Sequence, residues 1–140
     1  MIPDHVILHH SLTNDGKEVN YNAIKRYHVQ TLGWRDIGYH VVIENQRGKV
    51  NALFGRMLTE TGAHTKQRRM NNRSIGLCMV GNFDIAEPSP QVWNLALRLC
   101  RSFMEIYGIS KEEVQGHREY ASYKSCPGNL FDLDKFRKQL

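Results

Sequence analysis

The chain has 140 residues, of which 41% are hydrophobic and 24% are charged, as in an ordinary soluble globular domain. No apolar run approaches the roughly 18 residues of a membrane span, and three cysteines without framework spacing argue against a disulfide scaffold. The net charge of +5 suits an acidic partner, but the basic residues are scattered, so we expect no nucleic-acid binding. A chain of this length can build one core, so we expect a single domain over residues 1–140.

The first half of the chain predicts two strands, a helix and a hairpin. Residues 5–10 are a short apolar strand, and residues 20–33 are an amphipathic helix that is capped by asparagine and ends at glycine. Residues 39–43 form the next strand, which turns back into residues 50–53.

The second half predicts a central strand followed by the strongest helix of the sequence. Residues 74–81 are a continuous apolar run closed by glycine, as in a strand buried on both faces. Residues 89–108 run from Ser-Pro to Gly with apolar residues at helical spacing. A short strand at 114–115 and a helix at 131–140 follow. Strands separated by helices predict an α/β fold, with a central mixed β-sheet flanked by helices on both faces.

The cysteines fall into two environments. Cys78 and Cys100 lie inside apolar stretches, and we expect both to be small buried core residues. Cys126 precedes Pro-Gly in a polar loop and is a candidate for chemistry.

A histidine, a lysine and a cysteine lie within ten residues of loop-like sequence, at His117, Lys124 and Cys126. The first strand ends in His9 and His10, which offer a further ligand. Two histidines and one thiolate bind zinc tetrahedrally and leave a fourth position to water, as in catalytic zinc sites. Adjacent strand residues point to opposite faces, so only one of His9 and His10 can reach the metal, and this reasoning does not choose between them.

Five short motifs lie in order along nearly the whole chain. They are ILHHS at 7–11, GWRDIGYH at 33–40, GAH at 62–64, the segment 71–81, and the segment 116–128 with GHR and KSCPG. Together they resemble the type 2 N-acetylmuramoyl-L-alanine amidases, which include phage lysozyme-type amidases and peptidoglycan recognition proteins. The resemblance implies a Zn²⁺-dependent hydrolase that cuts the amide between N-acetylmuramic acid and L-alanine in peptidoglycan.

The resemblance also assigns the metal ligands. It implies that His9, His117 and Cys126 bind zinc, and it selects His9 over His10. His10 is then expected to be a packed residue or a partner of a ligand.

Four further residues receive roles from the matched motifs. Tyr39 and Lys124 fall on the family's catalytic positions, whereas without the match a strand tyrosine would be a packed aromatic and a loop lysine a solvated one. With an ordinary pKa near ~10, Tyr39 is expected to donate a hydrogen bond or orient water rather than act as a base. His64 and Asn71 are expected to bind substrate.

The chain departs from its relatives in one spacing, and a second comparison indicates its branch of the family. The separation of His117 and Cys126 is one residue longer than in many relatives, so we expect a wider loop at 120–123. The cytoplasmic recycling amidases have aspartate as third ligand and glutamate on the central strand, where this chain has Cys126 and Cys78. The resemblance is therefore to the phage-type branch.

The resemblance implies a phage or prophage endolysin or a bacterial autolysin, and we expect a monomer. Residues 1–5 lack the basic and apolar regions of a signal peptide, which favours an endolysin made in the cytoplasm that acts on the bacterial cell wall.

Two alternatives are a module that binds peptidoglycan without cutting it and a structural-zinc or nucleic-acid-binding protein, which needs a fourth protein ligand. If sugar bonds were cut instead, Glu60 and Glu119 would be the carboxylates to examine.

Overall fold

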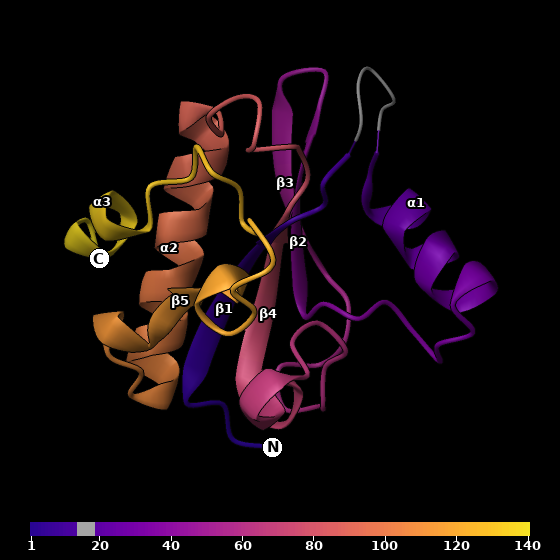
Figure 1. The fold of residues 1–140 in the computed structure, drawn as a ribbon, viewed down its shortest axis with the longest axis horizontal. Helices are drawn as coiled ribbons and strands as arrows, with labels where there is room; N and C mark the ends of the chain where they lie inside the picture. The colour runs from indigo at the N-terminus through magenta and orange to yellow at the C-terminus, as the bar shows by residue number, and fades with distance from the viewer. Residues whose placement is uncertain (14–18) are drawn as a thin grey trace.

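Five strands form one mixed sheet in the computed structural model, which describes residues 1–13 and 19–140 (Figure 1). Their order across the sheet is β3-β2-β4-β1-β5. The strands are β1 (His5–His10), β2 (Val41–Gln46), β3 (Lys49–Phe54), β4 (Ser74–Met79) and β5 (Val114–Gly116). β4 and β5 both pair in parallel with β1, β2 pairs in parallel with β4, and β2 and β3 form the predicted antiparallel hairpin.

The central position of β4 explains its sequence. All six of its residues are buried, because β1 and β2 lie on either side and other elements cover both faces. The prediction of a two-sided buried strand is confirmed. Cys78 on this strand and Cys100 on α2 are also fully buried, as expected.

Helix α2 (Pro90–Tyr107) covers one face of the sheet. It begins where Ser89 Oγ accepts a hydrogen bond from the Val92 amide, and it ends at Gly108, whose left-handed φ of 69° suits glycine. Its apolar side packs on residues of β1, β2 and β4. The predicted bounds of this helix are correct.

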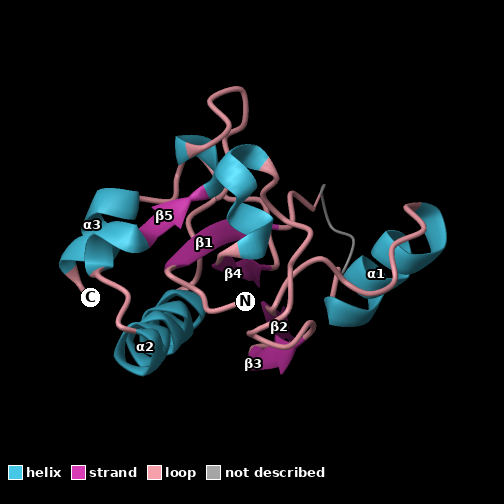
Figure 2. Ribbon diagram, turned by 90° about the horizontal axis from the view of Figure 1, so that it is seen from below, coloured by secondary structure: helices cyan, strands magenta, loops and turns pink. Residues whose placement is uncertain are grey.

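Helix α1 (Tyr21–Arg26) covers the opposite face (Figure 2). The Asn20 side chain caps it, and Ile24 packs with Ile37, Val42 and Cys78. The predicted helix over 20–33 is present as a continuous helical run, which changes from α-helical to π-helical over Tyr27–Thr31. The last helix, α3 (Leu133–Lys138), contacts β5 and is shorter than predicted, because Asp132 caps its start.

The predicted helices on both faces are therefore present, and the fold is the expected α/β class. None of the helices in the described part of the chain combines the length and apolar character needed to cross a bilayer.

Candidate metal centre

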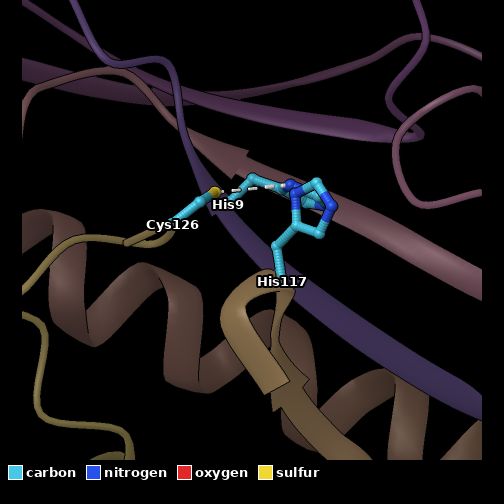
Figure 3. Close-up of side chains that lie close together, drawn as sticks. All are labelled: His9, His117 and Cys126. Carbon is cyan, nitrogen blue, oxygen red and sulfur yellow. Dashed lines mark hydrogen bonds between the residues drawn. The ribbon is translucent and has the colours of Figure 1, made fainter. Parts of the chain in front are cut away.

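Three donor side chains converge at the carboxyl ends of β1 and β5 (Figure 3). His9 is near the end of β1, His117 directly follows β5, and Cys126 comes from the loop after the 3₁₀ turn His117–Glu119. β1 and β5 are parallel, with Leu8 beside Gly116, so their following residues meet at one edge of the sheet. The donor atoms of the three residues all lie within 4.8 Å of one another.

The geometry of this group fits a tetrahedral metal. His9 Nδ1 lies 3.5 Å from Cys126 Sγ. Nitrogen and sulfur ligands at usual zinc bond lengths, placed on two corners of a tetrahedron, are about 3.5 Å apart. Within residues 1–13 and 19–140, no fourth His, Cys, Asp or Glu belongs to the group. The three residues can therefore hold a metal and leave one coordination position open.

His10 lies on the other face of the sheet. Its Nδ1 accepts a hydrogen bond from the Phe83 amide at 3.1 Å, and its ring packs 6.0 Å from the Phe83 ring. This side chain is buried on the α2 side, away from His117 and Cys126.

Burial shifts the pKa values of the two imidazoles and of the thiol in opposite directions. Burial and the neighbouring imidazoles of His64 and His117 hold the pKa of His9 well below its ordinary value. Burial, helped by the Lys124 charge, lowers the pKa of His117 to about 4. Both imidazoles are therefore neutral at pH 7 and ready to bind a metal. Burial raises the pKa of the Cys126 thiol to about 11, so a metal must displace its proton.

Tyr39 and Lys124 flank the centre. The Tyr39 ring lies 5.2 Å from the His9 ring between centroids, and burial raises the pKa of its phenol well above the ordinary value. Tyr39 is therefore a neutral donor at pH 7, which argues against a role as base. Lys124 is exposed, yet its charge lowers the pKa values of His9 and His117.

An open groove of about 400 Å³ adjoins the centre. One metal-site residue, His117, forms part of its wall together with Lys124 and both residues predicted to bind substrate. The lining residues are Trp34, Ala63, His64, Thr65, Lys66, Gln67, Asn71, His117, Tyr123 and Lys124.

His64 and Asn71, the two predicted substrate residues, line the groove and also make hydrogen-bonding contacts within the protein. The Asn71 side-chain oxygen accepts hydrogen bonds from the backbone amides of His64 and Thr65, each at 2.7 Å. His64 Nδ1 lies 3.0 Å from Nε2 of His9. Asn71 thus shapes the loop that carries His64, and His64 touches a metal-site residue, a contact that no local sequence pattern predicts.

Two charged residues missed by the sequence reasoning hold the Cys126 loop. The guanidinium of Arg118 donates to the carbonyl oxygens of Ser125 and Gly128. The Asp84 carboxylate accepts a hydrogen bond from Ser125 Oγ at 2.8 Å. These bonds fix the backbone on both sides of Cys126. Arg118 lies 7 and 10 positions from its two partners, whereas Asp84 reaches Ser125 from 41 positions away.

His28 and His40, the other histidines of the matched region, support the backbone. His28 Nδ1 accepts a hydrogen bond from the Gly38 amide, and His40 Nδ1 accepts one from the Gly76 amide, both at 2.9 Å. These bonds position the segment that carries Tyr39.

Glu60 and Glu119 are engaged in other interactions. Glu60 pairs with Arg35 at 3.0 Å, and Glu119 pairs with Arg137 at 3.1 Å. Neither residue lines the groove beside the metal centre. Among the described residues that line the groove, there is no pair of carboxylates of the kind that cuts a glycosidic bond.

Residues 1–129 match the family model described as N-acetylmuramoyl-L-alanine amidase. The endolysin of Escherichia phage T7 is 32% identical over 139 residues, which are 95% of this chain and 84% of that protein. The endolysin of Enterobacteria phage T3 is 37% identical over 134 residues, or 94% of this chain and 83% of that protein.

A solved structure shows the same fold. N-acetylmuramoyl-L-alanine amidase LysC from Clostridium intestinale URNW superposes with a TM-score of 0.84 at 26% identity, covering 99% of this chain and 85% of that chain. The motifs, the fold and the relatives agree: the chain belongs to the type 2 N-acetylmuramoyl-L-alanine amidase family.

Proposed function

We propose that this protein is a zinc-dependent amidase that hydrolyses the bond between N-acetylmuramic acid and L-alanine in peptidoglycan. The observation that carries the proposal is the convergence of His9, His117 and Cys126 beside an open groove. A binding protein has no need of three metal donors with one position left open, whereas a metal-dependent hydrolase requires them.

Zinc suits the proposed ligands. Imidazole nitrogen and thiolate sulfur are donors that zinc prefers, and carboxylate-binding ions such as magnesium and calcium do not match this set. When bound, zinc supplies Lewis acidity, which activates water near neutral pH and polarises a carbonyl group.

We assign Tyr39 and Lys124 to the charge that develops on the amide oxygen. Addition of water to the carbonyl carbon makes this oxygen negative. The Lys124 ammonium attracts that charge, and the neutral Tyr39 phenol can donate a hydrogen bond to it. Loss of one such donor typically lowers the rate by about 10²–10³-fold.

The groove is the proposed binding site for the substrate. Its openness suits a polymer, since a closed cavity would exclude a glycan strand with attached peptides. His64 and Asn71 line it, and the side-chain NH₂ group of Asn71 is the part that can face a peptide carbonyl. The two phage relatives, both endolysins by name, support a phage or prophage endolysin that acts on the cell wall. We further propose that it acts as a monomer.

A suspension of purified peptidoglycan tests this function. Protein loaded with one equivalent of zinc should clear the suspension, a chelator should stop clearing, and added zinc should restore it. Cys126→Ser is the control, since it alters the metal site with little change in shape. Binding to peptidoglycan without clearing by the zinc-loaded protein would show a recognition module instead.

A further inference from the structure

The two ring nitrogens of His9 face different partners. Nδ1 lies 3.5 Å from Cys126 Sγ, on the side of the metal centre. Nε2 lies 3.0 Å from Nδ1 of His64, on the opposite side of the ring. Thr65 Oγ1 is close to both, at 3.4 Å from His9 Nε2 and 3.2 Å from His64 Nδ1.

These contacts determine which ring nitrogens of His9 and His64 carry the protons when a metal is bound. A metal at Nδ1 of His9 needs the lone pair of that atom, so the ring proton must be on Nε2. Nε2–H then donates to His64 Nδ1, and the proton of His64 must be on its own Nε2. When a metal occupies Nδ1, this contact therefore stabilises the His9 tautomer that binds it.

His64 is held in place from two sides. A Cβ atom added at Gly62 or at Gly76 would lie 2.5 Å from His64 Cδ2, so only glycine leaves room for this ring. Asn71 Oδ1 binds the backbone amide of His64 at 2.7 Å. The acceptor atom cannot swing away from His9 without moving the loop or β4.

We propose that His64 is a positioning residue, which fixes the orientation and tautomer of His9 and thereby raises the affinity of the centre for its metal. This inference rests on the proposed metal site, and it gives His64 a role other than substrate contact. Partners of this kind typically change metal affinity by about 10–100-fold when they are removed.

Zinc affinity measured by competition with a chelator tests the proposal. His64→Leu keeps the bulk but removes the acceptor, and it should weaken zinc binding by about 10-fold or more. His64→Asn retains an acceptor near the Nδ1 position and should recover most of the affinity. Lys66→Ala, which changes the same groove wall, is the matched control and should bind zinc like the unaltered protein.

The outcomes separate this proposal from the proposed function. Equal zinc affinity in folded His64→Leu and unaltered protein would overturn the positioning role while leaving the metal site intact. Failure of the unaltered protein to bind zinc would overturn the site itself, and with it this inference.

A second measurement needs no variant. In the zinc-loaded protein, ¹⁵N shifts of the imidazole rings should show His9 with its proton on Nε2 and its metal on Nδ1. A proton on Nδ1, or zinc on Nε2, would overturn the proposal even if His64→Leu did not fold.

Discussion

His9 and His10 are neighbours on β1, yet their rings serve opposite faces of the sheet. His9 Nδ1 faces Cys126 Sγ at 3.5 Å, whereas His10 Nδ1 accepts a hydrogen bond from Phe83 on the α2 side. The alternation of strand side chains enforces this division. Two adjacent residues of the same type therefore have different expected roles.

Replacement of each histidine by alanine should separate these roles. His9→Ala should lose stoichiometric zinc and all activity, because only two of the three protein ligands remain to bind the metal. His10→Ala should retain its zinc, although it loses a buried hydrogen bond and some stability. Metal analysis after dialysis checks both variants, and zinc loss in His10→Ala alone would reverse the assignment.

Tyr39→Phe and Lys124→Ala should affect turnover rather than metal content. Both side chains are assigned to charge that appears in the transition state, so each change should lower kcat by about 10²-fold or more. Zinc should remain near one per chain. Kinetics on a soluble muropeptide, with metal analysis of the same samples, check this prediction. Full activity in either variant would remove that residue from the mechanism.

The metal-free protein should lose stability as the pH falls from 7 to 5. Burial lowers the pKa of His64 to about 3 and that of His117 to about 4, whereas in the unfolded chain both titrate near the ordinary 6.5. Between these values the unfolded state binds more protons, so the free energy of unfolding decreases with falling pH. We expect Tm to drop by about 5 °C or more.

Thermal unfolding followed by circular dichroism, in the presence of chelator, measures this effect. Carboxylates stay mostly ionised down to pH 5, so the histidines dominate this range. A constant Tm between pH 7 and 5 would mean that the buried imidazoles are protonated at little cost.

Tyr123 should contribute to substrate binding. It lines the groove, its side chain is 75% exposed, and its hydroxyl accepts a hydrogen bond from Gln67 Nε2 at 3.0 Å. Tyr123→Ala should raise KM about fivefold, since an aromatic contact contributes roughly 1 kcal/mol. Tyr123→Phe keeps the ring and should have a smaller effect. An unchanged KM for Tyr123→Ala would exclude contact with the substrate.

Helices and strands that depend on nearby residues could be predicted from the sequence. The strand over 5–10, the hairpin and the helix from Ser89 to Gly108 follow from apolar periodicity and capping residues, and the structure has them at or near the predicted residues. The motif match selected His9 over His10 as a metal ligand. In the structure, the donor atoms of His9, His117 and Cys126 converge.

Contacts between distant segments could not be predicted in this way. The contact between His9 and His64 joins residues 55 positions apart, and the hydrogen bond between Asp84 and Ser125 joins residues 41 positions apart. The two short 3₁₀ pieces within Gln67–Asn72 were also missed. A kink separates them, because Arg68 and Arg69 adopt left-handed φ values of 49° and 59°, which their residue type does not favour.

Identification of the bond that is cut tests the central claim most directly. Purified peptidoglycan digested by the zinc-loaded protein, with His9→Ala as the blank, should gain free amino termini on L-alanine and no new reducing sugar ends. The family leads us to expect cleavage at L-alanine, and we expect no reducing ends because Glu60 and Glu119 are paired with arginines away from the groove. New reducing ends, or new amino termini on any residue other than L-alanine, would contradict the account.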